Sequence, residues 1–243
     1  MTTHNVEVTL RIPGRWSNLC ELTKSLPAGC HLTQELFLMP DGTGFEVNIR
    51  EADNQFVAVF ASSCRQDPTD EEKKAIEQYS VQVCLTGPGG SAEKARELMR
   101  AAEAILQAGG AGVFIDNSGV AFGATQWREL SQCNDAEAIS FAFVGIIRGK
   151  TDAFTVGLHI LGLPDLLMRK EDIGDDGQVI IELIQYVSTH EREVGDGHSI
   201  LDTHGMRFFV SAVKDEKVAA HSPMHNPWGR LRLTSTSQIC ESN

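Results

Sequence analysis

The sequence predicts an α+β fold, in which an antiparallel or mixed sheet carries helices packed on one face. Residues 80–122 contain, in succession, a strand, a glycine-rich turn, a long amphipathic helix and a second strand. Elsewhere apolar residues alternate with polar ones, which is typical of half-buried strands. Residues 80–148 follow the order βαββαβ, which matches a ferredoxin-like unit with two helices on one face of the sheet. The flanking strands either extend this sheet or build a second such unit.

The central segment begins with alternating side chains at residues 81–86, and the glycines and proline of residues 87–90 end that strand. Ser91 is a typical helix N-cap. Apolar residues at spacings of three and four then predict a helix that stops at Gly109 and Gly110. The turn lacks both the lysine of a P-loop and the last glycine of a dinucleotide motif. We therefore interpret it as a plain turn and helix cap.

The pattern of residues 1–79 predicts an N-terminal α+β segment with the element order βαβββα. Alternation predicts a strand at residues 6–12, and a turn at residues 40–44 joins a predicted hairpin. The apolar run at residues 56–61 is interpreted as a further strand, and Thr69 with Glu72 forms a capping box that opens a helix. The remaining chain, residues 80–243, is predicted to hold the ferredoxin-like core and a C-terminal extension. The alternative is one continuous globular domain.

Beyond the central segment, five more elements are expected. The apolar run at residues 141–147 is interpreted as an interior strand, and residues 154–160 alternate as a half-buried strand would. A helix is predicted from Val179 to about His190, followed by closing strands at residues 206–213 and 231–233.

The charge and cysteine content limit the possible environments and partners. The 243-residue chain has a net charge of −12 and a hydrophobic fraction of 42%. An acidic chain is repelled by nucleic acid and by anionic membranes, so we expect neither as a partner. The six cysteines are scattered, with no CxxC pair. This pattern predicts reduced thiols in a cytoplasmic protein, not a disulfide or zinc framework.

Three segments carry a family resemblance: AGGAGVFIDNSGVAFGATQW (residues 108–127), VGLHILGLPDLLMR (residues 156–169), and GHSILDTHGMRFFV through NPWGRLRL near the end. Their order and their glycine, proline and apolar positions resemble an uncharacterised bacterial family known only as a domain of unknown function. The resemblance covers roughly residues 80–235. It implies a soluble bacterial α+β protein and implies no reaction, and we single out no catalytic residue and no cofactor.

Histidines are concentrated in the last third of the chain, where they suggest a metal site. Imidazole and carboxylate groups suit divalent metals, so His198, Asp202, His204 and His221 are the candidate ligands. No HExxH motif supports them, and solvated or core histidines are the more common case. His159 faces away from the apolar side of its predicted strand, which favours a hydrogen-bonded or surface role over metal ligation.

A second candidate site follows the buried strand at residues 111–115. Asp116 and Asn117 begin a polar loop, and loops at strand ends often hold ligands. Asx residues followed by glycine also make an ordinary tight turn. Trp127 is a candidate interface anchor, although large aromatic residues also dominate protein cores.

The function predicted from the sequence is non-enzymatic binding. Acidity, a well-patterned core and the absence of catalytic motifs favour a cytoplasmic interaction protein, for example one that neutralises a basic protein partner such as a toxin. The alternative is a metal-assisted enzyme that uses the C-terminal His/Asp cluster.

Overall fold

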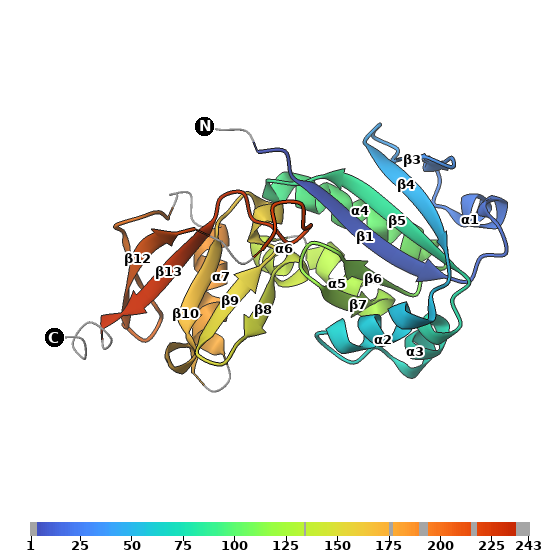
Figure 1. Ribbon diagram of the computed structural model, residues 1–243. Helices are drawn as coiled ribbons and strands as arrows, with labels where there is room; N and C mark the ends of the chain where they lie inside the picture. Colours follow the sequence, from blue (N-terminus) through green and yellow to red (C-terminus); the bar gives the residue numbers. More distant parts are fainter. Residues whose placement is uncertain (1–3, 134, 175–176, 190–193, 215–217, 237–243) are drawn as a thin grey trace.

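The computed structural model describes residues 4–133, 135–174, 177–189, 194–214 and 218–236, and it has the α+β architecture that the sequence predicts. Two sheets lie side by side, with α4 behind one of them and α7 behind the other (Figure 1). Within the described ranges, none of the helices has the length and apolar character needed to cross a membrane.

The first sheet joins the N-terminal part of the chain to the central segment, and all its strand pairs are antiparallel. Its spatial order is β2 (His31–Leu32), β3 (Leu36–Leu38), β4 (Gly44–Glu51), β5 (Val81–Pro88), β1 (Glu7–Gly14), β6 (Gly112–Ile115) and β7 (Val120–Gly123). The expected boundary between residues 79 and 80 falls inside this sheet, because β5 pairs with both β4 and β1.

The second sheet is built from the C-terminal part of the chain and is mixed. Its order is β11 (Ser199–Leu201), β12 (Arg207–Val213), β13 (Arg230–Ser235), β10 (Asp165–Arg169), β9 (Asp152–Val156) and β8 (Gly145–Arg148). The β10–β13 pair is parallel, and the others are antiparallel.

The helices connect and cover these sheets. They are α1 (Leu19–Ser25), α2 (Asn54–Ser63), α3 (Asp70–Glu77), α4 (Ala92–Gln107), α5 (Ala124–Cys133), α6 (Ala136–Phe143) and α7 (Gln178–Thr189), with short 3-10 helices η1 (Leu158–Leu161) and η2 (Lys170–Ile173). The N-cap at Ser91 and the capping box of Thr69 and Glu72 are both formed as predicted. Local hydrogen-bonding residues thus set these helix starts.

One continuous hydrophobic core runs from the first sheet through α4, α5 and α6 to α7 and the second sheet. The apolar stripe of α4 is buried in it, with Leu98 and Ile105 fully inaccessible. A smaller cluster lies on the opposite face of the first sheet, where α2 and α3 cover β6 and β7. Most of the outer face of β4, β5 and β1 therefore carries no helix, although α3 also contacts β1.

The ferredoxin-like unit expected at residues 80–148 is not observed as one sheet. The elements occur in the expected order along the chain, but β1 lies between β5 and β6, and β8 belongs to the second sheet. Strands that follow one another along the chain become neighbours in the sheet only when no other strand pairs with the edge between them. Here β1 forms an eight-residue register with β5 and separates it from β6.

Three predicted strands have a different structure. Residues 56–61 lie in α2, which Asp53 caps, and residues 141–143 end α6, which Asp135 caps. Short apolar runs do not distinguish a buried strand from a buried helix. In the structure, each of these two helices begins at an aspartate whose side chain accepts from a backbone amide of the first turn. The strand predicted at residues 154–160 ends at Val156, since Gly157 adopts a φ of 101° and begins η1.

Candidate functional site

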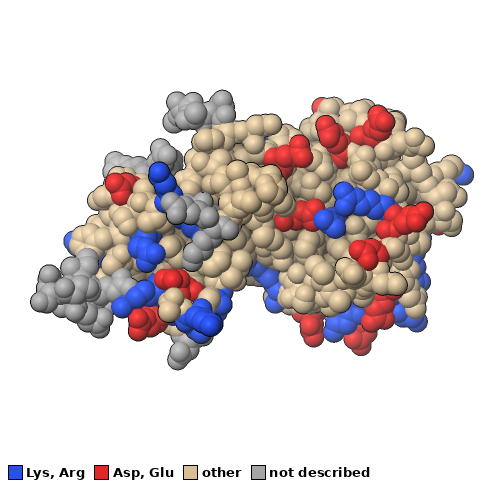
Figure 2. Space-filling model, in the orientation of Figure 1, with Lys and Arg blue, Asp and Glu red and all other residues tan. Residues whose placement is uncertain are grey.

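The uncovered face of the first sheet is polar and hollowed. Residues of β4, β5, β1 and neighbouring loops line a depression of about 560 Å³: Glu7, Thr9, Glu35, Glu46, Val47, Asn48, Arg50, Cys84, Thr86 and Asp116. We call this the polar face. Figure 2 shows acidic residues grouped around basic ones over the part of the molecule that holds these strands.

The polar face carries more carboxylates than cations. Asp116 forms an ion pair with Arg11, in which Oδ1 lies 2.7 Å from Nε, and a second cation, Arg50, also lines the depression. Within the described residues, the other three carboxylates, those of Glu7, Glu35 and Glu46, take part in no ion pair within 4.0 Å. The surface therefore has an excess of negative charge that can attract cations.

A second depression adjoins the polar face where the two sheets meet. This seam pocket has a volume of about 450 Å³ and shares Glu7, Thr9 and Asp116 with the polar face. Its remaining lining comes from residues 5–6, Asn117, His159 and residues 220–227. The loop between β12 and β13 thus folds back against the start of β1.

Asn117 holds the seam together with its side-chain amide. Its Oδ1 accepts from the Thr9 amide at 3.0 Å, and its Nδ2 donates to the Glu7 carbonyl at 2.9 Å. These two bonds continue the β1–β6 ladder beyond the last residue of β6, because the amide presents an acceptor and a donor as backbone does. Nδ2 also donates to the Pro223 carbonyl at 2.9 Å, which ties the returning loop to the first sheet.

His159 forms the floor of the seam pocket and is held neutral. Its side chain is buried on η1, and its Nε2 lies 3.1 Å from the Pro223 carbonyl, so Nε2 carries the hydrogen. Burial, with a smaller contribution from nearby His225, lowers the pKa of His159 to about 4, against the opposing effect of the bond to Pro223. Among the described residues Nδ1 has no hydrogen-bond partner.

The position of η1 depends on a close backbone contact with the turn that follows β5. Gly90 donates its amide to the Ile160 carbonyl at 2.9 Å. A Cβ on Gly162 would overlap the Gly90 carbonyl oxygen, so only glycine permits this approach. The glycine-rich turn therefore packs against the second half of the molecule, in addition to the predicted capping of α4.

The seam pocket can bind cations or hydrogen-bond donors. It offers the carboxylates of Glu7 and Asp116 and the buried imidazole of His159. A general base works best when its pKa lies near the working pH, and a histidine with a pKa of about 4 is far from that optimum at neutral pH. The geometry therefore favours binding over acid–base chemistry.

The structure brings together some of the predicted site residues. Asp116, Asn117 and His221 line the seam pocket. Trp127 lies in the core, where its indole nitrogen donates to the Met99 carbonyl at 3.3 Å. Sequence reasoning did not place His159 in a pocket; it expected a hydrogen-bonded or a surface role, and the structure shows a buried, hydrogen-bonded side chain.

The other predicted metal ligands lie on the β11–β12 hairpin. Asp202 accepts from the amides of His204 and Met206 at 3.0 and 2.7 Å, and His198 Nδ1 accepts from the Gly195 amide at 3.1 Å. These bonds shape the ends of the hairpin. Across the described part of the chain, no group of three or more His, Cys, Asp or Glu side chains is arranged to hold a metal ion.

Comparison of the chain with protein-family models, with curated proteins and with solved structures gives no match.

Proposed function

We propose that this is a non-enzymatic, cytoplasmic binding protein whose polar face engages a basic segment of a protein partner. The observation that carries the proposal is the group of carboxylates Glu7, Glu35 and Glu46, which surround a depression and have no ion-pair partner among the described residues. A partner with lysine and arginine side chains would supply the missing countercharges. The reduced cysteines of the described chain support the cytoplasmic assignment.

The neighbouring seam pocket supports the same proposal. It continues the polar face to the meeting point of the two sheets and shares the carboxylates of Glu7 and Asp116 with it. A lysine or arginine side chain that entered this pocket would meet the carboxylates of Glu7 and Asp116, and Asp116 is already held in place by Arg11. Preorganised acceptors lower the entropic cost of binding.

A charge-reversal experiment tests the proposal. One variant carries lysine at Glu7, Glu35 and Glu46, and the matched control carries lysine at Glu71, Glu77 and Glu93, which are exposed on α3 and α4. The probe is a lysine- and arginine-rich peptide, titrated by fluorescence anisotropy at several salt concentrations.

We expect the peptide affinity of the polar-face variant to be at least about tenfold lower than that of the control variant, because local charge complementarity governs encounter and register. Amide chemical-shift changes in the native protein should map to β1, β4 and β5. Equal losses in the two variants would show that net charge alone draws the peptide, and the proposal would fail.

The metal-assisted alternative has no comparable support in the described residues. Elemental analysis of purified protein tests it directly, since an enzyme of that kind would carry stoichiometric metal.

A further inference from the structure

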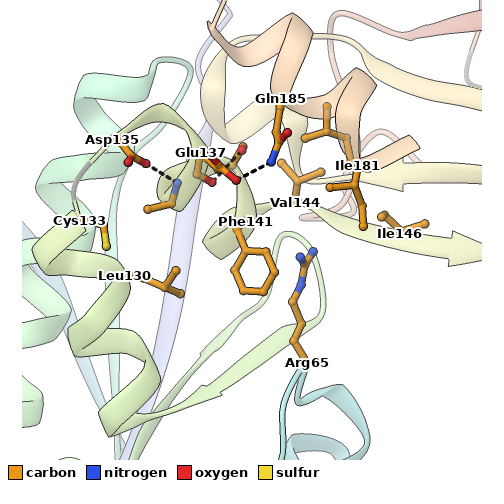
Figure 3. Close-up of a pocket in the computed structure, with 13 residues that line it drawn as sticks. Arg65, Leu130, Cys133, Asp135, Glu137, Phe141, Val144, Ile146, Ile181 and Gln185 are labelled. Atoms are coloured by element: carbon orange, nitrogen blue, oxygen red, sulfur yellow. Dashed lines mark hydrogen bonds between the residues drawn. The ribbon is translucent and has the colours of Figure 1, made fainter. Parts of the chain in front are cut away.

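A separate pocket, on the helical side of the molecule, has a different chemistry from the polar face. It has a volume of about 260 Å³ and lies between the α5–α6 corner, α7 and β8. Its walls are mainly apolar and include Leu130, Phe141, Val144, Ile146, Ile181 and Ile184 (Figure 3). An apolar cavity with few polar groups is the usual form of a small-molecule site.

One cation lies at the edge of this apolar pocket. Arg65 follows α2, and its backbone amide donates to the Ala121 carbonyl at 3.4 Å. Its guanidinium carbon lies 4.7 Å from the centre of the Phe141 ring. Burial lowers the pKa of Arg65 to about 10. Among the described residues no carboxylate lies within ion-pair distance of it. Arg65 is half-buried, and a guanidinium partly withdrawn from water is well suited to pair with a carboxylate.

The pocket's own carboxylates do not supply that partner. Asp135 caps α6 by accepting from the Ala138 amide at 2.7 Å, and Glu137 accepts from Gln185 Nε2 at 2.7 Å. Figure 3 shows both carboxylates near the start of α6, apart from the Arg65 guanidinium beside the Phe141 ring. They are close enough to the pocket to disfavour a ligand with two negative charges. The favoured occupant is therefore a monoanion with an apolar body.

We propose that this pocket binds a short aliphatic carboxylate. The carboxylate pairs with the Arg65 guanidinium, whose planar donors match its two oxygens. The alkyl chain fills the space between Phe141, Ile181 and Ile184 and removes apolar surface from water. This site is independent of the polar face, which lies on the first sheet and attracts cations.

Calorimetric titration with three eight-carbon probes tests the charge requirement. Octanoate, octanol and octylamine share their alkyl chain and differ in the head group. Native protein should bind octanoate and bind octylamine at least about tenfold more weakly, given the typical strength of a charge-assisted hydrogen bond. Equal affinity for octanoate and octylamine, or no detectable octanoate binding, would overturn the proposal.

Two variants then assign the charge to one residue. Arg65→Gln removes the proposed partner, and Arg207→Gln removes the same charge from an exposed position on β12. Octanoate affinity should fall about tenfold or more in the first variant and stay within about twofold in the second. Octanol should bind the native protein and both variants alike. An Arg65→Gln variant that melts at the native temperature and binds octanoate unchanged would refute the assignment.

A measurement on unmutated protein covers the case in which Arg65→Gln does not fold. Cys133 is an exposed thiol that lines the pocket, and Cys20 is an exposed thiol on α1. Octanoate should slow alkylation of Cys133 and leave alkylation of Cys20 unchanged, as followed by peptide mass spectrometry. Equal rates with and without octanoate at both thiols would place the ligand elsewhere and overturn the proposal.

Discussion

Replacement of Asn117 by alanine should destabilise the protein, because one buried side chain satisfies three backbone groups from two distant parts of the chain. Asn117 is 2% exposed and bonds to the Thr9 amide and to the Glu7 and Pro223 carbonyls. Each lost bond of this kind costs about 0.5–1.5 kcal/mol net, so the sum is about 1.5–4.5 kcal/mol. Water from the adjoining seam pocket can replace some of these bonds, which favours the middle of the range, about 3 kcal/mol.

Urea denaturation followed by circular dichroism measures this change in the free energy of unfolding. Asn48→Ala is the matched control, since Asn48 is exposed on β4 of the same sheet. Exposed substitutions of this kind usually stay within about 0.5 kcal/mol of the native protein. If Asn117→Ala cost no more than Asn48→Ala, the amide of Asn117 would not be holding the returning loop to β1, and the reasoning on the seam would be refuted.

Two further predictions concern buried side chains. His159 has a folded pKa of about 4, below its ordinary value of 6.5, so the unfolded chain binds more protons between these pH values and stability falls as pH falls through that window. Between pH 6.5 and 4, the free energy of unfolding of the native protein should therefore fall by up to about 1.4 kcal/mol per pH unit relative to that of His159→Gln. If the two proteins lost stability in parallel over this range, the buried neutral imidazole would be contradicted. Trp127→Ala should cost about 3–5 kcal/mol in chemical denaturation, because the ring is fully buried against Phe122 and Phe143; a loss below about 1 kcal/mol would show that the ring is not part of the core.

The candidate site was only partly predictable from the sequence. Asp116 and Asn117 were recognisable as a polar loop after a buried strand, and that is where they lie. The partners of Asn117 are 106 to 110 residues away along the chain, so no local pattern could identify them. Arg65 carried no signal, because a single arginine after a helix is ordinarily a solvated residue.

The fold shows the same division between local and distant information. Alternation identified β1 and β5, the turn at residues 40–44 marked the hairpin that leads into β4, and cap residues marked the starts of α3 and α4. The continuous apolar run at residues 141–147 gave no sign that its first part ends α6 and its last part begins β8. Periodicity records which face of an element is buried, whereas it does not record which element covers that face.

By itself, the sequence determined the local features of this protein: its fold class, its amphipathic elements, their caps and its negative charge. Only the tertiary structure decided that β1 separates β5 from β6, that Asn117 and His159 meet below the Pro223 loop, and that Arg65 faces an apolar pocket. The physical reason is that backbone propensity and solvation act over a few neighbouring residues. Strand pairing and pocket formation instead depend on the free energy of contacts between segments that the whole fold brings together.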